Sequence, residues 1–189
     1  MKRFIVLSLL MFITLSAKAG ELDLSKQATA FYSDNNRTKT MDLILQINES
    51  KRTAQDWILL GNVLADSGQM DNAAFMYQKA ISADKKAYKA YYNLANYYAE
   101  NGKFYIAEEY YKKAASIKND NPYIYYNLAL VNIKQNNLKS ARSNLNKAIT
   151  LKSDVPEFHY NLAYVYKQLN KPKLAETYLN NYNKLTSNY

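Results

Sequence analysis

Cysteine is absent from the 189-residue sequence, and histidine occurs only once. Without cysteine the chain can form no disulfide and has no thiol nucleophile, and one histidine cannot supply the several ligands that a zinc site needs. Glycine occurs four times, too rarely for a glycine-rich phosphate loop. The composition therefore predicts no metal site and no cofactor.

The net charge is +9 at pH 7. Three basic residues, Lys2, Arg3 and Lys18, precede Gly20 and no acidic residue does, so the rest of the chain carries +6. A basic chain raises nucleic acid as a partner, but these lysines are scattered rather than clustered. We predict no nucleic-acid binding, and at most a weak attraction to anionic envelope polymers or lipid headgroups.

Residues 1–19 have the pattern of a secretory signal peptide. Lys2 and Arg3 precede an apolar run, 4–15, which the small-residue sequence Ala17-Lys18-Ala19 follows. A run of about twelve residues is too short to span a bilayer comfortably. We therefore predict cleavage after Ala19, no stable membrane insertion and a periplasmic or secreted product, with a retained N-terminal anchor as the alternative.

The rest of the chain is organised around one sequence, Tyr-Tyr-Asn-Leu-Ala, at 91–95. It recurs unchanged at 125–129 and as His-Tyr-Asn-Leu-Ala at 159–163, each time 34 residues on, and a looser copy, Trp-Ile-Leu-Leu-Gly, lies at 57–61. A constant period of this length predicts a solenoid of stacked units.

Each unit is predicted to be a pair of antiparallel helices. In unit 88–121, apolar residues three and four positions apart indicate a first helix and then a second: Tyr91, Leu94, Ala95 and Tyr98, followed by Ala107, Tyr110, Tyr111 and Ala114. The turn between them contains a residue type that tolerates a left-handed backbone. In the four units this residue is Gly68, Gly102, Asn136 or Asn170.

Small residues recur where two helices would otherwise collide. They form three columns: Gly61, Ala95, Ala129 and Ala163; Ala73, Ala107, Ala141 and Ala175; and Ala80, Ala114 and Ala148. One pair of short helices cannot bury its own apolar stripe, so each hairpin needs its neighbour. The third column ends at Tyr182, which we interpret as the end of the array.

These features resemble the tetratricopeptide repeat family. The period, the small-residue columns and a core aromatic match its pattern over residues 54–189, the aromatic being Trp57, Tyr91 or Tyr125. The family's proline at the end of the second helix is missing, and Pro122 and Pro156 instead open a first helix, where proline is tolerated. The resemblance implies an all-α fold: a right-handed superhelical solenoid of antiparallel helical hairpins.

We predict one continuous array of four repeats, preceded by a divergent hairpin. The repeats are 54–87, 88–121, 122–155 and 156–189. Residues 20–53 are predicted to be a degenerate or capping hairpin, because Gln27, Lys39 and Gln46 stand where small residues are expected. A terminal unit, packed on one side only, can tolerate such changes.

The remaining candidates for catalysis are better explained as structural residues. His159 occupies the core aromatic position of its repeat, so we predict that it is packed rather than catalytic. Glu108 and Glu109 are adjacent on a helix and point about 100 degrees apart, so they are expected to pair with Lys112 and Lys113 four residues on. We predict that the chain is not an enzyme.

In arrays of this kind the first helices line the concave face. The position after the core aromatic is Ile58, Tyr92, Tyr126 or Tyr160, and four residues further on stand Asn62, Asn96, Leu130 or Tyr164. The predicted partner-binding set, called here the groove residues, is Tyr92, Tyr126, Tyr160, Asn62, Asn96, Tyr123, Tyr164 and Lys134.

Tyrosine offers a large contact area with a hydroxyl, and asparagine can both donate to and accept from a peptide backbone. The predicted ligand of the groove residues is therefore a segment of another protein. The alternative is that the tyrosines only pack between helices, and Asn93, Asn127 and Asn161 are expected first of all to hydrogen-bond between helices.

The last helix keeps apolar residues where the end of an array should be polar. Tyr178, Tyr182 and Leu185 either fold back onto the last repeat or form an edge for oligomerisation. Three functions follow: an envelope adaptor that binds a partner protein segment, a structural component that self-associates through this edge, or a cell-wall glycan-binding module. The adaptor role, in assembly of pilus, secretion or outer-membrane machinery, is implied by the family resemblance together with the signal peptide.

Overall fold

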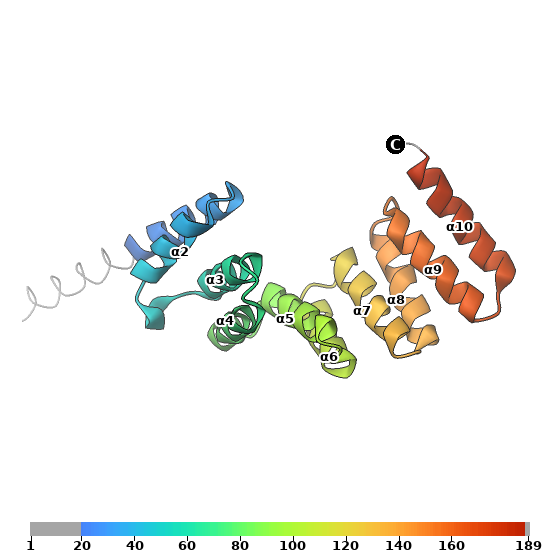
Figure 1. The fold of residues 1–189 in the computed structure, drawn as a ribbon, viewed down its shortest axis with the longest axis horizontal. Helices are drawn as coiled ribbons and strands as arrows, with labels where there is room; N and C mark the ends of the chain where they lie inside the picture. Colours follow the sequence, from blue (N-terminus) through green and yellow to red (C-terminus); the bar gives the residue numbers. More distant parts are fainter. Residues whose placement is uncertain (1–19, 188–189) are drawn as a thin grey trace, which may run out of the picture. The chain divides into compact units, whose positions relative to one another are not determined.

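The computed structural model describes residues 20–187, so the predicted signal peptide lies outside the described residues. Every regular element in this part of the chain is helical, and successive helices form hairpins, which confirms the predicted all-α fold (Figure 1). The chain divides into two compact units, one ending at Lys85 and the other beginning at Lys86. Each unit is described by itself.

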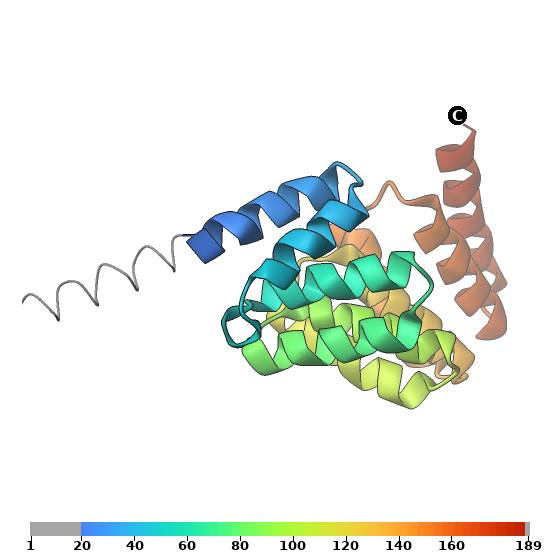
Figure 2. The same cartoon turned by 60° about the vertical axis from the view of Figure 1, so that its left-hand side comes forward.

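The described part of the first unit contains two helical hairpins. Helical residues 20–33 lie antiparallel to α2 (Arg37–Gln46) (Figure 2). A 3₁₀ turn, η1 (Glu49–Lys51), leads to the second hairpin, α3 (Ala54–Asp66) and α4 (Met70–Ala83). None of the helices in the described chain is both long and apolar enough to cross a membrane.

Helix α3 begins with a capping box that the sequence analysis missed. The backbone N–H of Asp56 donates to Thr53 Oγ1 (3.3 Å), and the backbone N–H of Thr53 donates to Asp56 Oδ2 (2.7 Å). Asp56 is buried, and its Oδ1 accepts a hydrogen bond from the Ser25 hydroxyl. The start of α3 is thereby attached to helical residues 20–33.

The second unit contains three helical hairpins. They are α5 (Tyr88–Glu100) with α6 (Phe104–Ile117), α7 (Pro122–Lys134) with α8 (Leu138–Leu151), and α9 (Pro156–Gln168) with α10 (Pro172–Thr186). Helix α7 packs on α6, and α9 packs on α8. Each new hairpin therefore places its first helix on the second helix of the hairpin before it.

The repeated small and turn residues occupy the places predicted for them. Alanines of the three columns, such as Ala107, Ala114 and Ala141, are fully buried, and a Cβ added to Gly61 would lie 2.7 Å from Tyr77 Cδ1. All four turn residues have a positive φ: Gly68 76°, Gly102 71°, Asn136 59° and Asn170 56°. Pro122 and Pro156 open α7 and α9 as predicted.

The N-terminal hairpin is out of register with the others by one residue. Gln27, Lys39 and Gln46, the positions that the 34-residue period singles out, are exposed or nearly so. The buried residues come one position later, at Ala28 and Thr40, and Asn35 takes the left-handed turn conformation with φ 61°. This hairpin thus contains the small residues of a repeat, shifted because the connection to α3 is one residue longer.

Candidate functional site

Asparagines link the tyrosines of neighbouring hairpins in the second unit. Asn127 Nδ2 donates to the Tyr92 hydroxyl (2.9 Å), and Asn161 Nδ2 donates to the Tyr126 hydroxyl (3.1 Å). The expected hydrogen bonding of these two asparagines between helices is confirmed. Since each bond uses the hydroxyl oxygen as acceptor, it holds the ring in place without consuming the hydroxyl proton.

The rings of Tyr92 and Tyr126 also pack against other aromatic residues. Tyr92 meets Tyr111 edge-on, with centroids 5.8 Å apart, and Tyr126 lies 4.8 Å from Phe158 of α9. Burial raises the pKa of both hydroxyls, and for Tyr126 the nearby Glu157 adds to this effect. These two groove residues therefore contribute to packing with one side of the ring.

The other tyrosines among the groove residues are much more open. Tyr160, Tyr164 and Tyr123 are 53%, 44% and 43% exposed. Tyr160 touches the ring of Tyr182, and the Tyr123 hydroxyl accepts a hydrogen bond from Lys152 Nζ (3.3 Å). Lys134 is exposed at the end of α7. Helices α7 and α9 thus present a set of accessible tyrosines beside a cation.

The two asparagines among the groove residues act as internal acceptors. Asn62 Oδ1 accepts from the Tyr77 hydroxyl (2.9 Å), and Asn96 Oδ1 accepts from the Tyr111 hydroxyl and from Asn127 Nδ2. Ile58, which the period places beside these residues, is buried. In the first unit, therefore, the residues at these positions support the fold more than they offer a binding surface.

The predicted oligomer edge is partly folded back onto the last repeat. Tyr178 stacks on Tyr166 and on His159, with centroids 5.5 and 6.0 Å away, and Tyr182 packs against Tyr160. Leu185 is half-buried. The exposed large apolar residues of α10 are instead Leu174 and Leu179.

The candidates for catalytic chemistry have structural environments. His159 is buried with Nε2 2.8 Å from the Ser153 carbonyl oxygen, in the packed position that the sequence predicts. Glu108 forms the expected ion pair with Lys112 (2.6 Å). Among residues 20–187, no three of His, Asp or Glu come together in a way that could hold a metal ion.

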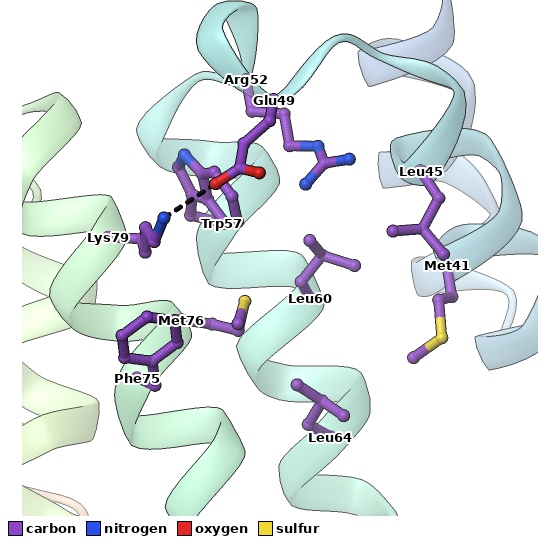
Figure 3. Close-up of a pocket in the computed structure, with 10 residues that line it drawn as sticks. All are labelled: Met41, Leu45, Glu49, Arg52, Trp57, Leu60, Leu64, Phe75, Met76 and Lys79. Carbon is purple, nitrogen blue, oxygen red and sulfur yellow. Dashed lines mark hydrogen bonds and ion pairs between the residues drawn. The ribbon is translucent and has the colours of Figure 1, made fainter.

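The first unit contains an apolar hollow that the sequence analysis did not predict. It has a volume of about 340 Å³ and opens between α2, α3 and α4 (Figure 3). Trp57 and Leu60 line it from α3, and Arg52 and Lys79 lie 5.0 and 5.3 Å from the Trp57 ring centroid. Lys79 is paired with Glu49 (2.7 Å).

This hollow has a structural origin in α2. Ile47 follows α2 and is buried where the repeats have the small residues Ala80 and Ala114, one position out of register. A larger residue there is expected to hold α2 away from α3, and α2 does pack less extensively on α3 than α7 does on α6. An irregularity of the shifted hairpin could have been found only by testing a second period.

Comparisons with known proteins place the chain among repeat proteins. Models of families described as "TPR repeat" and "Tetratricopeptide repeat" match residues 133–170 and 156–189, and one described as "Anaphase-promoting complex, cyclosome, subunit 3" matches 66–148. No curated protein gives a significant match.

Several solved structures named MamA share the fold. The structure of MamA 41-end from Desulfovibrio magneticus RS-1 has a TM-score of 0.77 at 14% identity, over 89% of this chain and 96% of that one. A structure of MamA MSR-1 has a TM-score of 0.73 at 15% identity, over 89% and 97%. At these identities the likeness shows the fold alone.

Proposed function

Because the chain is a tetratricopeptide-repeat protein, we propose that it is a non-catalytic interaction adaptor of the cell envelope. In this proposal the first helices of the repeats hold a segment of a partner protein in the concave groove expected of such arrays. The partner class is an envelope protein, and assembly of pilus, secretion or outer-membrane machinery is the role implied by the resemblance together with residues 1–19.

The accessible tyrosines of α7 and α9 are the observation that carries this proposal. Tyr123, Tyr160 and Tyr164 are exposed although their rings are large and apolar. Such residues dominate binding energy at protein interfaces, since they bury a large area and lose little side-chain entropy. The exposure of three of them on consecutive first helices supports a binding surface there.

The hydrogen-bonded tyrosines add polar groups at fixed positions. Tyr126 accepts a bond from Asn161 and keeps its hydroxyl proton, which can be donated to a backbone carbonyl of a bound segment. Because the ring is already held by Phe158 and Asn161, its ordering on binding costs little.

An affinity experiment with envelope extract tests this proposal. The bait is the chain from Gly20 onward, compared with the double variant Tyr123→Ala/Tyr164→Ala, in which both side chains are exposed and the helices are expected to stay folded. Tyr105→Ala is the matched control, because Tyr105 is 77% exposed on α6, a second helix.

We expect one partner to be retained by the wild-type chain and by the control, and its recovery to fall about tenfold or more with the double variant. Equal recovery by all three baits would show that the tyrosine surface is not the binding site. Retention on purified cell wall, lost with the same double variant, would instead favour the glycan-binding alternative.

A further inference from the structure

The repeat architecture shows how the end of a hairpin is normally covered. In hairpin α5–α6, Tyr111 is buried beneath Ile124 and Leu128 of α7. In hairpin α7–α8, Leu145 is fully buried beneath Leu162 and Val165 of α9. Each hairpin thus leaves an apolar face that the first helix of the next hairpin covers.

The corresponding face of the last hairpin is open in the described chain. Leu179 of α10 stands 34 residues after Leu145 and is 42% exposed, whereas Leu145 is 0% exposed. With Tyr164 of α9 it borders a hollow of about 430 Å³ over the small residues Ala163 and Ala175. We call this surface of α9 and α10 the end face.

Leaving such a face in water is unfavourable. A leucine gains about 1.5–3 kcal/mol when it is fully buried rather than exposed, and contiguous apolar patches on soluble proteins mark interaction sites. The end face also alternates large residues with a hollow above alanines, so a protruding side chain of a second surface could fill it.

Charged residues on the end face indicate what that second surface is. Lys167 of α9 and Glu176 of α10 border the same hollow, and within residues 20–187 neither forms an ion pair. A face that carries one unpaired charge of each sign is complementary to itself. When two copies are related by a two-fold axis, Lys167 of each copy can meet Glu176 of the other.

We propose that the end face joins two copies of this chain in a two-fold dimer. Leu179 and Tyr164 of each copy enter the hollow over Ala163 and Ala175 of its partner, and two Lys167–Glu176 pairs border the contact. The interface takes the place that the first helix of a following hairpin occupies within the array. It leaves the groove residues of α5 and α7 available to another protein.

Sedimentation analysis of the chain from Gly20 onward, which contains every described α-helix, tests the proposal. Over roughly 1 to 500 µM protein, we expect a reversible equilibrium between monomer and dimer. Leu179→Glu should weaken the dimer at least about tenfold, because it places a charge in an apolar contact. Tyr105→Glu, an exposed position on α6, should leave the dissociation constant unchanged. Circular dichroism verifies that each variant keeps its helices.

Charge reversal tests the two-fold pairing separately. Lys167→Glu and Glu176→Lys should each weaken the dimer about fivefold or more, and the double variant should restore it to within about twofold of the wild-type chain. A wild-type chain that stays monomeric, forms larger assemblies, or dimerises equally well with Leu179→Glu overturns the proposal. Failure of the double variant to recover overturns the two-fold arrangement.

Discussion

At the scale of single residues, the chain changes tyrosine and its acceptor together. Tyr77 and Tyr111 donate to Asn62 and Asn96 in the first two repeats. In the next repeat the same two positions are Leu145 and Leu130. A buried hydroxyl without an acceptor costs about 1–3 kcal/mol, which explains why the asparagine disappears where the tyrosine does.

Tyr111→Phe tests this hydrogen bond and its pH dependence. Burial raises the pKa of the Tyr111 hydroxyl far above its ordinary value of 10.0. Above pH 10 the unfolded chain therefore loses a proton that the folded chain keeps, and stability falls as the pH rises. We expect Tyr111→Phe to lower the free energy of unfolding by about 1 kcal/mol at pH 8 and to reduce the loss of stability at pH 11.

Urea unfolding followed by circular dichroism at both pH values measures the effect, with Tyr105→Phe as an exposed control. If Tyr111→Phe loses as much stability between the two pH values as the wild-type chain, burial of this hydroxyl is not what makes the fold sensitive to alkali.

The buried alanines could be predicted from the sequence, whereas the hydroxyl pairs were missed. Ala107 and Ala141 follow from a constant period and from the crowding of two helices. The pairing of Tyr111 with Asn96 depends on side-chain directions across two helices, which periodicity alone does not give. The joint replacement of both residues in the third repeat is the signal that could have revealed it.

At the scale of helices, the N-terminal hairpin shows how a fixed period can mislead. Residues 20–53 were expected to be degenerate because Lys39 and Gln46 replace small residues. The structure instead buries Ala28 and Thr40 and turns the chain at Asn35. One extra residue before α3 is enough to displace every comparison, although the physical requirement for a small residue is still met.

Substitutions in this turn test the shifted register. Asn35 has φ 61°, a conformation that costs a residue with an ordinary side chain about 1 kcal/mol and glycine nothing. We expect Asn35→Ala to lower the free energy of unfolding by about that amount and Asn35→Gly to be neutral or slightly stabilising. Asp34→Ala, at the position named by the 34-residue period, should have little effect. Equal effects at Asp34 and Asn35 would contradict the register described here.

At the scale of the whole molecule, the positions of the groove residues follow from the repeat, but their exposure does not. Tyr126 and Tyr160 occupy the same place in their repeats, yet Phe158 covers one side of Tyr126 while Tyr160 remains half exposed. The difference arises because α9 has no further first helix beside it in the described chain. Exposure thus depends on neighbours that differ along the array.

The proposed location gives a prediction about the mature chain. If residues 1–19 are a signal peptide, the protein recovered from the periplasm or the medium should begin at Gly20. Intact-mass measurement of the protein isolated from its producing cells checks this, with a Lys2→Glu/Arg3→Glu variant expected to accumulate unprocessed. A mature protein that retains Met1 or Lys2 would indicate an anchor instead.

Photo-crosslinking in living cells tests the central claim, partner binding through the accessible tyrosines, most directly. A photoreactive phenylalanine analogue replaces Tyr123, Tyr160 or Tyr105 in the full-length chain, one position at a time. Our account predicts the same envelope protein crosslinked at Tyr123 and Tyr160, and no such product at Tyr105, which is more exposed than either. Crosslinks of equal yield at Tyr105, or none at Tyr123 and Tyr160, would contradict it.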